Sequence, residues 1–313
     1  MFCTESSVIV HEQRMTPVPG HIGALMVSYL ACVAPGRLGS LINRALYWSE
    51  NRRRRIDFMI IGIQKAGTSW LSARLHEVPD IQLSYPKETQ FFKFRWRPEY
   101  DQWSPERVRA RYLRRFWSPP RAKILFEASP GYVVDGAIAR RVARILPDVR
   151  LIVVLRNPVH RAYSAYNMWV RNRQWPLSFQ QTCLPVLERA RQASAQHGDR
   201  LSFYQSLGLD VPDNLISYGL YYYHLIQWFE VFPRDRFYVM TTADLNNPER
   251  LADLLSFVGA EREGVAAMQL GREAAGKHLG APISDTDRER LEAFFAPYNQ
   301  ILFKLLDVPD LDW

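Results

Sequence analysis

The sequence contains little cysteine. Only three of its 313 residues are cysteines, Cys3, Cys32 and Cys183, and they lie far apart along the chain. A disulfide framework needs an even set of cysteines, and a structural zinc site needs closely spaced ones. The sequence therefore argues against a disulfide-rich scaffold and against a cysteine metal site, and it favours a reducing compartment.

An apolar run long enough to cross a bilayer is also missing from the N-terminal region. The stretch "HIGALMVSYLACVAPG" is apolar for roughly 14 residues, whereas a spanning helix needs about 20. No signal-peptide pattern is clear, because no basic region stands directly before this run. We interpret residues 1–55 as an N-terminal extension and residues 56–313 as the main domain.

The extension allows two interpretations. Its apolar run is followed by "LGSLINRALYW", with apolar residues at helical spacing, and then by four arginines at positions 52–55. An apolar helix next to basic residues can lie on a membrane surface. The alternative is a helical arm that packs against the main domain. We therefore expect a cytoplasmic protein, with peripheral membrane contact through this segment as one of the two interpretations.

Acidic residues are outnumbered by basic ones. The chain has 40 lysines and arginines against 32 aspartates and glutamates, which gives a formal net charge of +8. A basic balance favours anionic partners, such as nucleotides, sulfated or phosphorylated substrates, or a membrane surface. The alternative is a solvated, arginine-rich surface without a specific partner.

Apolar runs that alternate with amphipathic segments indicate the fold class. Continuous apolar runs predict buried strands, and residues at helical spacing predict the helices between them. The strands are expected within residues 56–63, 122–129, 149–156 and 236–245. This alternation is typical of an α/β fold, here a P-loop-like parallel sheet with helices on both faces. Ligands of such sheets bind beyond the carboxyl ends of the strands, so the loops after Ile63, Ser129 and Arg156 should meet at one site.

The first of these loops has the composition of an anion cradle. In "FMIIGIQKAGTSWL", Gly62 and Gly67 bracket the loop, and Thr68 and Ser69 open a helix. Backbone N–H groups of such a loop and of the helix N-terminus can hold a phosphate or sulfate. A plain strand-to-helix turn is the alternative interpretation.

Two features of a metal-dependent kinase are lacking. A P-loop nucleoside triphosphatase carries G-K-[ST] at the end of the loop, but here Lys65 stands two residues before Gly67. The strand ending in "VVLR" has an arginine where a magnesium-binding aspartate is expected. A kinase is therefore disfavoured, and no metal site is predicted.

A second anion contact is predicted in "LRNPVHRAYSAY", residues 155–166. Arg156 stands at the carboxyl end of a strand, and Ser164 lies two turns into the following helix. An arginine fork and a hydroxyl can together hold a phosphate. Arg161 is expected instead to face solvent or to pair with an acid.

These segments resemble the two nucleotide-binding motifs of the sulfotransferase superfamily, whose donor is 3′-phosphoadenosine 5′-phosphosulfate (PAPS). The resemblance is strongest to the heparan sulfate N-sulfotransferase and 3-O-sulfotransferase branch, and it covers about residues 56–313. Further matching elements, in the order of the family, are "ETQFF", "FEASPGY", "GLYYYHLIQWFEVFP" and "FFAPYNQILFKLL". The family commonly has a lysine at the position of Ala128, and that charge is missing here.

The resemblance implies a role for individual residues. Lys65 would contact the 5′-phosphosulfate, Arg156 and Ser164 would bind the 3′-phosphate, and Glu88 falls on the catalytic glutamate of the family. The remaining donor-binding positions that it implies are Ala66, Gly67, Thr68, Ser69 and, in a loop that closes over the nucleotide, Lys277.

The chemistry of the residue types agrees with these roles. Lys65 can stabilise negative charge on the leaving oxygen, and Glu88 can accept the proton of an acceptor hydroxyl or amine. An exposed, salt-bridging glutamate is the alternative for Glu88, while His160 and His76 are weaker candidates for the base.

The sequence leaves the acceptor open. Residues 174–217 are expected to contact it or to form a lid, but they contain no motif that names it. A carbohydrate or glycolipid is favoured, and a peptide or secondary metabolite remains an alternative, as does a non-catalytic nucleotide-binding or membrane-scaffold protein. The expected partner is thus a glycan or small-molecule acceptor, and no nucleic acid.

Overall fold

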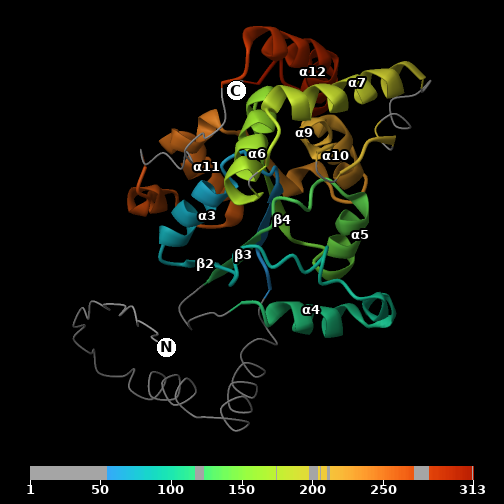
Figure 1. The fold of residues 1–313 in the computed structure, drawn as a ribbon. Coiled ribbons are helices and arrows are strands. Elements are labelled where there is room, and N and C mark those ends of the chain that lie inside the picture. Colours follow the sequence, from blue (N-terminus) through green and yellow to red (C-terminus); the bar gives the residue numbers. More distant parts are fainter. Residues whose placement is uncertain are drawn as a thin grey trace, which may run out of the picture. The chain divides into compact units, whose positions relative to one another are not determined.

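Five parallel strands form the centre of the computed structural model (Figure 1), which describes residues 55–116, 123–173, 175–196, 204, 206–209, 212–270, 282–311 and 313. The strand order is β2-β3-β1-β4-β5, and every neighbouring pair is parallel. The strands are β1 (Phe58–Gly62), β2 (Ile81–Leu83), β3 (Ile124–Ala128), β4 (Arg150–Leu155) and β5 (Phe237–Thr241). The predicted α/β fold with a parallel sheet is confirmed.

The three central strands are buried along almost their whole length, as their continuous apolar runs predict. All residues of β1 and β3 are buried, and the rings of Phe58 and Phe126 stack at 4.6 Å between these two strands. The edge strand β2 was not predicted. It has only three residues, and Gln82 interrupts its apolar pattern, so periodicity could not distinguish it from a loop.

Helices cover both faces of the sheet. In Figure 1, α3 (Thr68–Glu77) and α11 (Pro248–Val258) lie to one side of the strands, and α5 (Gly136–Ile145) and α10 (Tyr221–Phe229) lie to the other. A second apolar cluster joins four further helices beside this core. They are α6 (Pro158–Arg173), α7 (Phe179–Gln196), α9 (Asn214–Ser217) and α12 (Asp285–Leu306).

The remaining elements are short. The helix α4 (Pro105–Leu113) packs against α5 and was not predicted, because its arginines hide the buried positions Val108, Tyr112 and Leu113. The 3-10 helices are η1 (Pro98–Gln102), η2 (Arg234–Arg236), η3 (Ala243–Asn246) and η4 (Arg262–Ala267).

Local sequence signals set where the site helices begin. The side chain of Asn157 accepts hydrogen bonds from the backbone N–H groups of Val159 and His160, at 3.0 and 3.2 Å. Pro158 occupies the first position of α6, where its missing N–H costs nothing. The Asn157-Pro158 pair thus lies at the end of the connection from β4 and starts α6, the helix that carries Ser164.

Two predicted features lie outside the described residues. The first is the N-terminal extension of residues 1–55 with its expected membrane contact, of which the structure describes only Arg55. The second is the loop that contains Lys277. Within the part of the chain that the structure describes, no helix is both long enough and apolar enough to span a bilayer.

Candidate functional site

The loops that follow β1, β3 and β4 come together at the carboxyl edge of the sheet. The N–H of Ile63 donates to the carbonyl of Val154 at 2.9 Å, and Nη1 of Arg156 donates to the carbonyl of Lys65 at 3.0 Å. The loop after β2 reaches the end of β3, where the N–H of Gln90 donates to Oγ of Ser129 at 3.3 Å. The N–H of Val133, in the loop after β3, donates to the carbonyl of Ile61 at the end of β1 at 3.0 Å, so the expected meeting of the three loops is observed.

The loop after β1 has a backbone shape that few residues adopt. Lys65 and Gly67 both have a positive φ, 76° and 87° respectively. A Cβ at Gly67 would lie 2.4 Å from Cδ1 of Leu245, so a larger residue there would be both strained and crowded. Because Gly67 has no side chain to cap α3, the first N–H groups of the helix are left to face a ligand. This arrangement is suited to an anion.

Positive charge is concentrated at this loop. Burial lowers the pKa of the Lys65 ammonium, and the charges of Arg171, Arg156 and Arg161 lower it further. Burial also lowers the pKa of Arg156. Like charges held close together in a partly buried place cost free energy unless an anion joins them. The cluster therefore indicates an anionic ligand that carries more than one charge.

Arg161 corrects the sequence-based expectation that it faces solvent or pairs with an acid. Its side chain is fully buried, and Nη2 donates to the carbonyls of Asn214 and Leu215, each at 2.8 Å. These carbonyls belong to the short helix α9. The acceptors lie more than 50 residues from Arg161, so the local sequence could not reveal them.

Glu88 lies beside the cradle on an exposed loop. The Nζ of Lys87 is 3.2 Å from Oε1 of Glu88 and 2.9 Å from Oγ of Ser69. The side-chain amide of Gln90 donates to Oε2 of Glu88 at 2.9 Å. Lys87 thereby connects the predicted base with the start of α3. Lys87 was not predicted as a site residue, although its position directly before Glu88 is a signal that could have been used.

The other predicted donor-binding residues differ in their burial. Ala66 and Thr68 are buried, Ser69 is exposed at the start of α3, and Ser164 is half-buried on α6. Lys277 lies outside the described residues.

The two histidine candidates differ in their surroundings. Burial lowers the pKa of His160, and the neighbouring charges of Arg156 and Arg288 lower it further, so its ring is neutral and able to accept a proton near pH 7. His76 is exposed in the last turn of α3, about 12 Å along the helix from the cradle. His160 therefore remains the stronger of the two.

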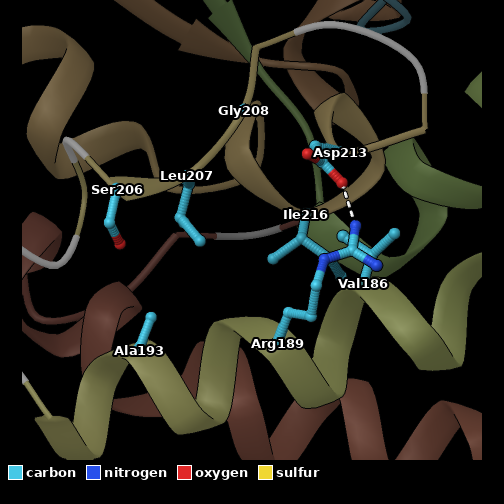
Figure 2. A pocket seen from close by; sticks show the side chains of 8 residues that line it. All are labelled: Val186, Arg189, Ala193, Ser206, Leu207, Gly208, Asp213 and Ile216. Atoms are coloured by element: carbon cyan, nitrogen blue, oxygen red, sulfur yellow. Dashed lines mark hydrogen bonds and ion pairs between the residues drawn. The ribbon is translucent and has the colours of Figure 1, made fainter.

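A hollow of about 270 Å³ lies between α7 and the segment around Gly208 (Figure 2). It belongs to the region where acceptor contacts or a lid are expected. The guanidinium of Arg189 within it is already paired with the carboxylate of Asp213. The positive charge of Arg189 is therefore balanced by Asp213 within the lining, whereas the cations around Lys65 have no such acidic partner among the described residues.

No group of three or more histidines, cysteines, aspartates or glutamates suited to a metal ion is found within the described ranges.

The site as a whole defines a class of protein. It combines a cationic cradle, a helix N-terminus behind the cradle and the carboxylate of Glu88 at its edge. These features suit a phosphate- or sulfate-bearing ligand at the carboxyl edge of a parallel sheet.

Comparisons with known proteins define this class further. The sulfotransferase family matches residues 57–212. The heparan sulfate glucosamine 3-O-sulfotransferase 6 of Mus musculus is 26% identical over 285 residues, which cover 84% of this chain and 75% of that protein. The bifunctional heparan sulfate N-deacetylase/N-sulfotransferase 2 of Bos taurus is 30% identical over 292 residues, which cover 83% of this chain but only 30% of that protein.

A solved structure agrees with the sequence matches. The sulfotransferase from Alicyclobacillus acidocaldarius superposes with a TM-score of 0.59 at 26% identity, covering 82% of this chain and 97% of that one. The chain belongs to the sulfotransferase family and is an enzyme that transfers a sulfuryl group.

Proposed function

We propose that this sulfotransferase takes its sulfuryl group from PAPS and transfers it to a hydroxyl or amine of a carbohydrate, with Glu88 as the general base. The carbohydrate acceptor is inferred from the relatives, which are named for heparan sulfate and its glucosamine units. The same donor chemistry would serve a glycolipid, peptide or secondary-metabolite acceptor, so the acceptor is a separate part of the proposal.

The observation that carries the donor assignment is the cationic cluster around Lys65. PAPS bears anionic groups at two ends, the 5′-phosphosulfate and the 3′-phosphate. Lys65 with the N–H groups of residues 67–69 suits the first, and Arg156 with Ser164 suits the second. Binding of such a ligand would bring opposite charge to Lys65, whose pKa is lowered by burial and by neighbouring arginines, and to Arg156, whose pKa is lowered by burial.

The residues of the site have matching chemical roles in an in-line transfer. Negative charge develops on the leaving phosphate oxygen, and the ammonium of Lys65 can stabilise it as it forms. The acceptor must lose a proton, and the carboxylate of Glu88 can take it. The ammonium of Lys87 lies 3.2 Å from Oε1 of Glu88 and donates to Oγ of Ser69, so it links the carboxylate to the start of the cradle helix.

Binding of adenosine 3′,5′-bisphosphate tests the donor assignment without any acceptor. We expect calorimetry to show binding of equal strength with and without a metal chelator, and binding weaker by about tenfold or more in Lys65→Ala, which removes a charge-assisted contact. Lys123→Ala is a matched control, because Lys123 is exposed and pairs with Asp80 before β3, away from the cradle. A requirement for magnesium, or a preference for ATP over the bisphosphate, would overturn the proposal.

A further inference from the structure

The carboxylate of Glu127 is fully buried in the middle of the sheet. It stands in β3, and four hydroxyl groups donate to it. Oε1 accepts hydrogen bonds from Thr89, Ser129 and Tyr132, at 2.6, 2.5 and 2.9 Å, and Oε2 accepts one from Tyr112. Burying a carboxylate among neutral groups costs free energy. The four hydroxyl donors that this side chain has gathered therefore call for an explanation.

Three of these hydroxyls also hold the loop that carries Glu88. Oγ of Ser129 accepts from the N–H of Gln90 at 3.3 Å, Oγ1 of Thr89 accepts from the N–H of Phe91 at 3.2 Å, and the hydroxyl of Tyr132 accepts from the N–H of Phe92 at 3.2 Å. Three consecutive backbone amides are therefore bound through three hydroxyls to one carboxylate oxygen.

The direction of these hydrogen bonds follows from the number of protons. A hydroxyl has one proton to donate and lone pairs to accept with. Once the proton of Thr89, Ser129 or Tyr132 points at Glu127, the lone pairs of that oxygen are free to face a loop amide. Without the carboxylate, each hydroxyl could rotate its proton toward the amide, where it would repel the N–H.

The loop needs such support. Gln90 has a φ of 51°, a conformation that non-glycine residues rarely adopt, and the side chain of Glu88 is exposed. On the other side of Glu88, the N–H of Ala128 donates to the carbonyl of Lys87 at 3.3 Å. The backbone on both sides of Glu88 is therefore attached to the end of β3.

We propose that Glu127 is a positioning residue for sulfuryl transfer, because it orients the hydroxyls of Thr89, Ser129 and Tyr132 so that they fix the backbone next to Glu88. This inference rests on the proposed role of Glu88 as the base. Tyr112 offers an internal comparison, since its hydroxyl donates to the same carboxylate but to Oε2, and this hydroxyl makes no other hydrogen bond within the described residues.

Amide hydrogen exchange measured by NMR tests the positioning directly, without an acceptor or a donor. Thr89→Val, Ser129→Ala and Tyr132→Phe each remove one hydroxyl with little change in shape. We expect exchange about fivefold faster at the amide that each hydroxyl accepts from, which is Phe91 for Thr89→Val, Gln90 for Ser129→Ala and Phe92 for Tyr132→Phe. This factor matches a typical hydrogen bond. Tyr112→Phe, the matched control, removes one donor from the same carboxylate and should leave these amides protected.

Substitutions of Glu127 distinguish its role as a hydrogen-bond acceptor, which orients the hydroxyls, from the space that its side chain fills. Glu127→Gln retains one oxygen that can accept from the three hydroxyls, so it should keep most of the protection. Glu127→Leu removes the acceptor and should accelerate exchange at all three amides together. If the leucine variant does not fold, the three hydroxyl variants and Tyr112→Phe still decide the question.

Turnover supplies the second readout. With desulfated heparan sulfate as acceptor, Thr89→Val, Ser129→Ala and Tyr132→Phe should lower kcat while the affinity for adenosine 3′,5′-bisphosphate stays unchanged. Faster exchange in Tyr112→Phe equal to that in Tyr132→Phe, or unchanged exchange in all three variants, would overturn the inference. Normal turnover in Glu88→Gln would instead overturn the proposed function, so the two failures are distinguishable.

Discussion

Lys65 combines three properties that rarely meet in one lysine. Its backbone has a positive φ, its carbonyl accepts from Arg156, and its ammonium lies in the field of Arg156, Arg161 and Arg171. A lysine in a left-handed conformation costs free energy, and such strain is commonly retained where it serves a site.

The lowered pKa of Lys65 predicts a pH dependence of nucleotide binding. An anionic ligand favours the charged ammonium, so the pKa of Lys65 should rise when the nucleotide binds. Above the lowered pKa of the free protein, and below the ordinary value of 10.5, binding should take up a proton, and affinity should fall as the pH rises. Arginines remain charged throughout this range and do not contribute.

Calorimetry of adenosine 3′,5′-bisphosphate binding in buffers of different ionisation enthalpy measures this proton uptake. We expect uptake at alkaline pH in the wild-type protein and none in Lys65→Met. Equal uptake in the two proteins would show that another group is responsible, and His160 would then be examined at lower pH.

Single residues divide sharply into those that the sequence could predict and those that it could not. The loop residues around Lys65 and Arg156 were recognisable because they follow apolar strands at a fixed spacing. The contacts of Arg161 and Glu127 were not, because both side chains have partners at distant positions: α9 for Arg161, and Thr89 and Tyr112 for Glu127. Pairing across the fold leaves no periodic signal in one strand or helix.

At the scale of elements, the site depends on where α6 begins. Asn157 caps this helix, and the helix carries both the buried Arg161 and the predicted phosphate ligand Ser164. The central strands and most helices were predicted from apolar runs and helical spacing. The edge strand β2 and the helix α4 were not, because one is too short and the other too rich in arginine to show a pattern.

Loss of the cap predicts a measurable change in stability. Asn157→Ala removes the acceptor for the N–H groups of Val159 and His160, and it should lower the free energy of unfolding by about 1 kcal/mol. Denaturant unfolding measures this difference. Asn172→Ala, an exposed position in the last turn of the same helix, should change it by less than about 0.5 kcal/mol. Equal losses in the two variants would contradict the capping role.

At the scale of the whole molecule, the net charge of +8 is consistent with anionic substrates, but the site is defined by where the charges meet. The sheet order places β1 between β3 and β4, so the loops with Lys65, Ser129 and Arg156 are neighbours. The acceptor could not be predicted from the sequence, because no motif in residues 174–217 names it. The named relatives supply the hypothesis of a carbohydrate.

Transfer of radiolabelled sulfate from PAPS to desulfated heparan sulfate, compared between the wild-type protein and Glu88→Gln, is the most direct test of sulfuryl transfer with Glu88 as the base. Glutamine keeps the size of the side chain but cannot accept the proton. The account predicts labelling of the carbohydrate by the wild-type protein and turnover lower by about 10²–10⁴-fold in Glu88→Gln, with unchanged affinity for adenosine 3′,5′-bisphosphate. Near-normal turnover in Glu88→Gln, or wild-type protein that labels phenolic or peptide acceptors but no carbohydrate, would contradict it.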